Sequence, residues 1–147
     1  MSPARPVNPE DWPRPSGYSN ATSAEGRIVC IAGQVGSDPA TGAVTSFDFA
    51  DQARRSLLNV RTALAAAGAA PADVVRLTWY VTDGQAYTGA RARIGEAYRE
   101  VFGRHYPAMS VVVVAGLLEP GAKVEIEATA VVPPHSHPSP SGTQPGG

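Results

Sequence analysis

The sequence predicts a single-domain α/β protein with elements in the order β-β-α-β-α-β-β and two helices on one face of the sheet. Its length of 147 residues is near the commonest size for one compact domain. With 43% hydrophobic and 17% charged residues, the composition is that of a globular chain with a core. Two segments have apolar residues at helical spacing. The segments around them alternate apolar and polar residues or run apolar, as strands do.

The first two strands are expected at residues 17–22 and 27–32. The second is rich in β-branched residues and follows a turn signal at Glu25-Gly26, so the two segments can pair as a hairpin. Cys30 lies in the apolar part of the second strand and is expected to be a small buried hydrophobe. A single cysteine allows no internal disulfide, which suits the reducing cytoplasm, the expected location.

Both helices are bounded by residues that favour helix ends. The first follows the apolar spacing from Phe49 to Ala67, with Asp48 able to cap its start and Gly68 suited to its exit. The second runs from about residue 89 to residue 102 and ends before Gly103. Its expected buried stripe is Ile94, Ala97, Tyr98, Val101 and Phe102.

Three further strands, at residues 75–81, 110–115 and 124–130, complete the predicted sheet. Residues 75–81 alternate, with the buried positions expected at Val75, Leu77, Trp79 and Val81. Residues 110–115 are nearly continuous valine, which predicts burial on both faces. Two helices cannot cover both faces, so we expect the second cover to come from another subunit. The alternative is that the proline-rich N-terminal arm folds over the sheet.

Proline divides the chain into three parts. Ten of the 14 prolines lie in an arm, residues 1–15, and a tail, residues 133–147, which leaves residues 16–132 as the folded domain. The tail has no aliphatic side chain and no Phe, Trp or Tyr, so we expect it to be disordered. The arm contains Trp12, which can dock on the domain.

The composition argues against several partners. The net charge is −1 and Lys123 is the only lysine, so no basic stripe is ready to bind nucleic acid. No segment has the apolar run of a secretory signal or the length of a membrane span, so no membrane partner is expected. No metal site is expected either, because two of the three histidines lie in the tail. The histidines are His105, His135 and His137.

Two carboxylates stand at positions i and i+2 of the last predicted strand, residues 124–130. Glu125 and Glu127 therefore share one face of that strand, and its other face is core. Spacing alone favours a solvated strand face. The alternative is a subunit boundary, where partial burial raises the pKa of a carboxylate and lets it move protons near neutral pH.

Five segments in register resemble the RidA (YjgF) family over residues 17–132. They are Ile31-Ala-Gly-Gln-Val35, the helix of residues 59–68 ending Leu-Ala-Ala-Ala-Gly, residues 73–83, Pro107-Ala-Met-Ser110 with the valines after it, and residues 121–128. The resemblance implies a chorismate-mutase-like fold and a homotrimer whose sheets form a central barrel. It also implies small-molecule clefts between subunits. There, members hydrolyse enamines and imines such as 2-aminoacrylate to a keto acid and ammonia, without a cofactor.

The same resemblance assigns site residues. Glu125 matches the acid that positions or activates water, Tyr18 a cleft tyrosine, and Gly33 a backbone contact. Ser110 and Val111 follow the position that holds the substrate carboxylate.

The sequence departs from the family at the carboxylate-binding position. The deaminases have Pro-Ala-Arg-Ser, and Met109 stands in place of that arginine. A thioether cannot make the charge-assisted hydrogen bonds of a guanidinium. Gly95 also stands where some deaminases carry a polar cleft residue. The cleft should then favour a more apolar or uncharged substrate, unless another arginine reaches in. The candidates are Arg91, Arg93 and Arg104.

Three functions are compatible with these observations. The first is hydrolysis of an enamine or imine, or a proton transfer on one, at clefts between subunits. The second is a non-catalytic trimer that binds a small molecule, which Met109 and Gly95 favour. The third is ribonuclease activity, as assigned to some relatives; the near-neutral charge and the lack of a histidine pair in the domain argue against it.

Overall fold

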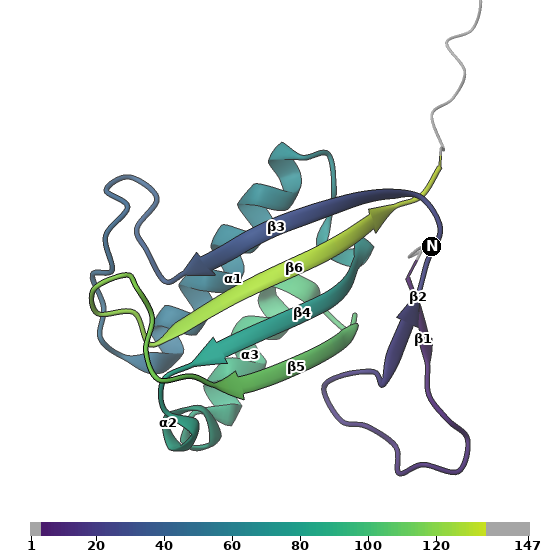
Figure 1. Cartoon of the computed structure of the whole chain (residues 1–147), viewed down its shortest axis with the longest axis horizontal. Helices are drawn as coiled ribbons and strands as arrows, with labels where there is room; N and C mark the ends of the chain where they lie inside the picture. The colour runs from purple at the N-terminus through teal and green to yellow at the C-terminus, as the bar shows by residue number, and fades with distance from the viewer. Residues whose placement is uncertain (1–3, 135–147) are drawn as a thin grey trace, which may run out of the picture.

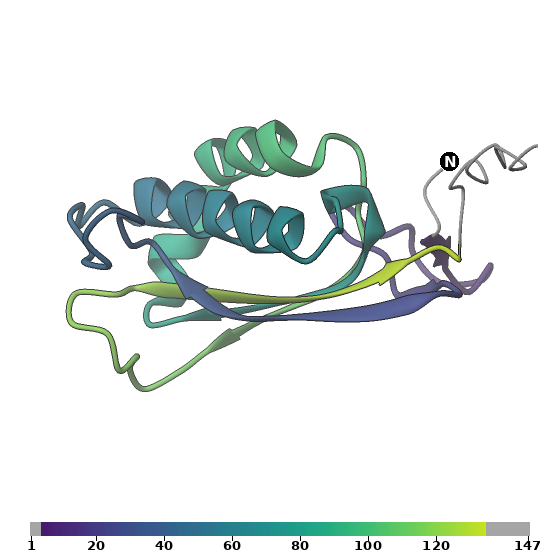
Figure 2. The same ribbon diagram turned by 90° about the horizontal axis from the view of Figure 1, so that it is seen from above.

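Two long helices lie side by side across one face of a four-stranded sheet and leave the other face open (Figure 1 and Figure 2). The structure is a computed structural model that describes residues 4–134. The helices are α1 (Phe49–Ala66) and α3 (Arg91–Phe102), and the strands are β3 (Arg27–Val35), β4 (Val74–Val81), β5 (Ala108–Val113) and β6 (Val124–Val132). The strand order is β3-β6-β4-β5, with only β4 and β5 parallel among these neighbours. The predicted α/β class is confirmed.

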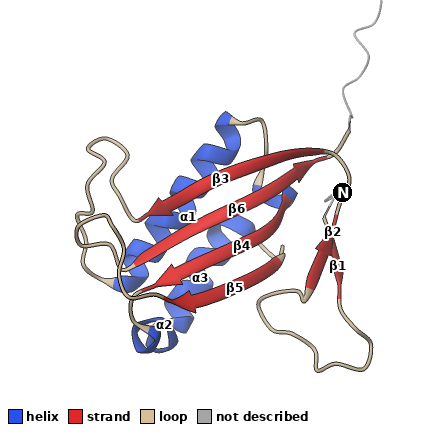
Figure 3. Cartoon of the chain, viewed as in Figure 1, coloured by secondary structure: helices blue, strands red, loops and turns tan. Residues whose placement is uncertain are grey.

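The N-terminal arm forms a hairpin with the segment that follows it, so the predicted strand pairing is wrong. β1 (Arg5–Val7) pairs antiparallel with β2 (Ala21–Ser23), and β3 pairs with β6 instead. Gly26 turns the chain directly onto β6, with a φ of 145° and no room for a side chain against the Val132 carbonyl. The hairpin lies beside the end of the sheet and does not cover its open face (Figure 3). The alternative that the N-terminal arm folds over the sheet is therefore wrong.

The helix predictions are confirmed for the two ends of α1 and for the buried face of α3, whereas α3 begins at Arg91 and not at residue 89. Asp48 caps α1 by accepting a hydrogen bond from the Asp51 backbone N–H at 3.0 Å, and Gly68 follows the helix with a φ of 75°. The buried residues of α3 are the five predicted ones. A short helix not predicted from the sequence, α2 (Gly84–Gly89), precedes α3 and is capped by Asp83.

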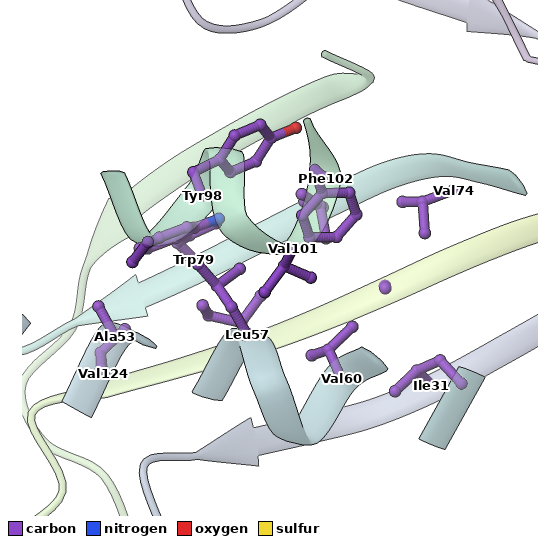
Figure 4. Packing of buried hydrophobic residues seen from close by; sticks show 14 of the residues in the cluster. Ile31, Ala53, Leu57, Val60, Val74, Trp79, Tyr98, Val101, Phe102 and Val124 are labelled. Carbon is purple, nitrogen blue, oxygen red and sulfur yellow. The ribbon is translucent and has the colours of Figure 1, made fainter. Parts of the chain in front are cut away.

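The core lies between the helices and the inner face of the sheet. Figure 4 shows Leu57, Trp79 and Val101 packed together there. The alternation predicted for β6 is confirmed, but β4 departs from its prediction at one end. A bulge between Val74 and Arg76 makes Val74 the buried residue and leaves Val75 only half-buried.

Residues 4–134 leave the outer face of the sheet uncovered, and this corrects one prediction. Cys30 is exposed because its side of β3 has no helix over it. The valine strand β5 is an edge strand within this chain, and its Val112 and Val113 are 41% and 64% exposed, so its predicted burial on both faces still depends on cover from another subunit. Among the described residues, no helix is long and apolar enough to cross a membrane. His135, His137 and most of the predicted tail lie outside the described residues.

A candidate active site in two halves

A cavity of about 710 Å³ opens between the N-terminal arm, α3 and the inner side of β5. Tyr18, Met109 and Val111, three of the residues predicted for the site, line it. Met109 and Val111 face inward because they pair with the buried positions Leu77 and Trp79 of β4. Two alternate side chains of β5 therefore line the same cavity.

Three hydrogen bonds fasten the segment that carries Tyr18 to the start of β5. The Ser19 backbone N–H donates to the Pro107 carbonyl at 3.1 Å, and the Ser19 hydroxyl donates to the Tyr106 carbonyl at 2.6 Å. The Thr22 hydroxyl accepts from the Ala108 backbone N–H at 2.7 Å. Ser19 is buried, so these bonds hold Tyr18 at the mouth of the cavity.

Aromatic side chains form much of the cavity wall. Tyr98 stacks on Tyr106 with ring centroids 5.4 Å apart, and Tyr87 meets the Trp79 ring edge to face at 6.0 Å. The Tyr98 hydroxyl donates to the His105 carbonyl at 2.5 Å. Burial raises the pKa of Tyr98 and of Tyr87, so both rings stay neutral at physiological pH.

The cavity carries positive charge and no negative charge. Among the described residues, Arg14, Arg91 and Arg99 line it, and no aspartate or glutamate does. Of the three arginines considered from the sequence, Arg91 reaches the cavity. Arg104 lines a neighbouring hollow, whereas Arg93 is held away by Asp48 at 2.8 Å and Asp51 at 3.1 Å. Arg99 was missed by sequence reasoning.

A second group of predicted residues lies together on the open face of the sheet. Glu125 of β6 places its carboxylate beside Gly33 of β3, where a side chain at position 33 would overlap it. Glycine is therefore needed at position 33, next to a shift in strand register between Ile31 and Gln34. The Glu125 carboxylate is half-buried and makes no hydrogen bond with residues 4–134.

Glu127, on the same strand face, has a partner. The Tyr80 hydroxyl donates to its carboxylate at 2.6 Å, and this hydrogen bond raises the pKa of Tyr80. The sequence spacing does not distinguish the two carboxylates, but in the structure only Glu127 is engaged in a side-chain hydrogen bond among the described residues. Glu125 is the one free to meet a ligand.

The two groups do not meet within one chain. Strand β4 separates Glu125 on β6 from β5, and the cavity lies on the opposite side of the sheet. Two strand spacings alone are about 10 Å. Ser110 does not line the cavity, because it faces outward between Met109 and Val111, and on the open face β4 separates it from Glu125. The structure thus contains a cavity half and a carboxylate half.

Comparison with known proteins agrees with this architecture. The family model described as Endoribonuclease L-PSP matches residues 12–132. Human 2-iminobutanoate/2-iminopropanoate deaminase is 33% identical over 117 residues, which are 80% of this chain and 81% of that protein. A RutC family protein of Pyrococcus horikoshii is 39% identical over 82% of this chain and 92% of its own length.

A solved structure shows the same likeness in three dimensions. YyfB of Yersinia pestis, described as a member of the conserved Rid protein family, is 35% identical with a TM-score of 0.78. The match covers 88% of this chain and 99% of that one. The chain therefore belongs to the family described as Endoribonuclease L-PSP, which is the RidA (YjgF) family.

Proposed function

We propose that this protein hydrolyses an imine or enamine to a carbonyl compound and ammonia, at clefts between the subunits of a cytoplasmic homotrimer. The observation that carries the proposal is the Glu125 carboxylate. It lies beside Gly33 with no hydrogen-bond partner among residues 4–134, on a sheet face that these residues leave open. The name of the human relative, an iminobutanoate and iminopropanoate deaminase, supports this reaction class.

The proposed reaction needs a water, a protonated C=N group and one carboxylate. Glu125 accepts a proton from the water as its oxygen bonds to the carbon, and the π electrons of the C=N bond move to nitrogen. The carboxylic acid returns the proton to nitrogen. The C–N bond then breaks and ammonia leaves the carbon, while the remaining hydroxyl proton passes to the carboxylate as the C=O bond forms. The carboxylic acid gives this proton to ammonia, which departs as ammonium, and the carboxylate is restored. An enamine enters the same sequence after taking up a proton at carbon. No electrons are gained or lost, so no redox cofactor is required.

Assembly of subunits would join the two halves of the site. In this proposal the open sheet face of one subunit packs near the cavity of the next, so that Glu125 reaches a substrate held by Tyr18, Met109 and Val111 of its neighbour. Exposed apolar residues at the edge strand support such a contact, since Val112 and Val113 are not covered by residues 4–134 and a second subunit would bury them.

Subunit mixing tests the shared site directly. Glu125→Gln removes the proton carrier, and Met109→Glu places a repelling charge in the cavity. Each variant alone should be inactive. Unfolded and refolded together in equal amounts, they should recover about a quarter of the wild-type activity. In randomly mixed trimers, about a quarter of the sites combine an intact carboxylate from one subunit with an intact cavity from the next. Each variant refolded alone is the control.

Two results would contradict the proposal. One is a mass near a single 15.2 kDa chain in light scattering, which would leave the carboxylate half without a partner. The other is mixed trimers, verified by native mass spectrometry, that stay inactive although each parent variant folds.

Ribonuclease activity, which the family description names, is less favoured by the described residues. The domain has one histidine, His105, and its Nε2 lies 2.7 Å from the Val74 carbonyl. This contact with the backbone engages one of the two ring nitrogens, and no second histidine lies in the domain to complete an acid–base pair. RNA incubated with the purified trimer should remain intact.

A further inference from the structure

The cavity lacks the family arginine at position 109, yet it is not short of cations. Arg99 projects from the last turn of α3 and lines the cavity. Its side chain makes no hydrogen bond or ion pair with residues 4–134. Its guanidinium is therefore available to an anion, unlike that of Arg93, which two aspartates hold.

The residue one helical turn before Arg99 makes room for it. Gly95 stands at position i−4, and a Cβ there would lie 3.1 Å from an Arg99 guanidinium nitrogen. Glycine inside a helix is less stable than alanine by roughly 0.5–1 kcal/mol, so its presence at the cavity needs a reason. The reason given by the geometry is that the guanidinium lies over the bare backbone of residue 95.

We propose that Arg99, lying over Gly95, binds the carboxylate of the substrate in place of the arginine missing at position 109. This inference rests on the proposed function and names its substrate class, a 2-imino or 2-enamino acid with a large aromatic side chain. Two arginines, Arg14 and Arg91, add to the positive charge around the same cavity, and no acid opposes them.

The size and walls of the cavity specify the rest of the substrate. A volume of about 710 Å³ far exceeds the side chain of a three-carbon imino acid. Tyr87, Tyr98, Tyr106 and Trp79 offer ring faces and edges on which an aromatic group can pack. Met109 adds a polarisable thioether to this wall in place of a charge.

A structural role is the alternative for Arg99. A cation in the last turn of a helix interacts favourably with the helix dipole, and Arg99 is the basic residue of that turn. That role would affect stability and leave ligand binding unchanged, so the two can be separated.

Binding of phenylpyruvate, a stable 2-oxo acid of the proposed size, tests the inference in the full-length protein by calorimetry. Arg99→Met should weaken this binding at least tenfold, because it removes charge-assisted hydrogen bonds to the carboxylate. Arg93→Met is the matched control, since it makes the same change on the same helix outside the cavity, and should change binding less than twofold. Gly95→Ala should raise the thermal stability and weaken binding less than Arg99→Met does, because its Cβ shifts the guanidinium by only a few tenths of an ångström.

Ligand controls separate the carboxylate from the ring. Pyruvate, which lacks the ring, and phenylacetone, which lacks the carboxylate, should each bind at least tenfold more weakly than phenylpyruvate. Equal binding of phenylacetone, a change of less than twofold in Arg99→Met, or no binding of phenylpyruvate by the wild type would overturn the inference.

The same measurements keep this inference apart from the proposed function. Arg99-dependent binding without hydrolysis of any imine would support the ligand class and reject the enzyme. Hydrolysis that is unchanged in Arg99→Met would support the enzyme and reject the role of Arg99.

Discussion

The two halves of the candidate site differ in how one chain builds them. The cavity half is built on buried structure, with Tyr98 6% and Trp79 1% exposed and Ser19 fastened by two hydrogen bonds. The carboxylate half lies on an uncovered sheet face, and its Glu125 has no partner among the described residues. The core of one chain can therefore fix the ligand-binding geometry, whereas the surroundings of the proton carrier depend on a second copy.

The largest expected effect separates the two carboxylates of the open face. Glu125→Gln should lower the rate of imine hydrolysis on the order of 100-fold or more, because the amide cannot carry the proton. Glu127→Gln should cost less, since Glu127 is occupied by Tyr80 at 2.6 Å. Steady-state rates of both variants give the ratio. Equal losses would mean that the open face acts as a whole and that Glu125 has no special role.

A smaller loss is expected from the residue beside that carboxylate. In Gly33→Ala the new Cβ displaces the end of the Glu125 side chain, which can move. The turnover number should fall by about tenfold, with little change in KM because the cavity half is untouched. Gly89→Ala is the control, since nothing lies within 4 Å of its Cβ position. A rise in KM alone would mean that Gly33 contacts substrate and does not position Glu125.

Local patterns predicted the elements well because their causes are local. The cap at Asp48 and the five buried residues of α3 depend on spacing along one helix. Strand partners depend on distant sequence, so the pairing of β2 with β1 was missed. Cys30 was misjudged because apolar neighbours do not reveal which face of a sheet a helix covers.

The site residues divide in the same way. Glu125, Gly33, Tyr18, Met109 and Val111 were named through the family resemblance, and the structure sorts them into two groups that sequence order does not reveal. Arg99 was missed because a long side chain near a helix end has no predictable direction. Gly95, four residues earlier, could have indicated it. In the sequence its position was interpreted as the loss of a polar cleft residue, whereas in the structure it leaves room for the Arg99 side chain.

A gain on a small substrate is expected when an arginine is placed at position 109, where the family arginine is missing. Met109→Arg should improve hydrolysis of 2-iminopropanoate by about tenfold, which corresponds to one charge-assisted hydrogen bond of roughly 1.5 kcal/mol. The substrate is generated by an amino-acid oxidase and measured in competition with semicarbazide. A wild type that already hydrolyses it efficiently would show that another residue holds small carboxylates. A folded but inactive variant would favour a binding protein over an enzyme.

The smallest expected effect is on the free energy of unfolding. It compares the Tyr98 hydroxyl of the cavity half with the Tyr80 hydroxyl of the carboxylate half. Tyr98→Phe removes a buried hydroxyl that donates to the His105 carbonyl at 2.5 Å, so the free energy of unfolding should fall by about 1 kcal/mol. Tyr80→Phe removes a hydroxyl on the open face and should have the smaller effect. Urea unfolding at equal protein concentration measures both.

The pH dependence of the Tyr98 effect has a definite sign. Burial raises the pKa of Tyr98 in the folded chain above its ordinary value of about 10 in the unfolded chain. Folding therefore favours the neutral ring, and this contribution is fully present below about pH 10 and is lost as the pH rises further. The wild type should lose more stability between about pH 9 and about pH 11 than Tyr98→Phe does, so the gap between them should close. A constant gap over that range would mean that the Tyr98 hydroxyl ionises as readily in the folded chain as in the unfolded one, and the cavity wall would then be as open to water as the sheet face.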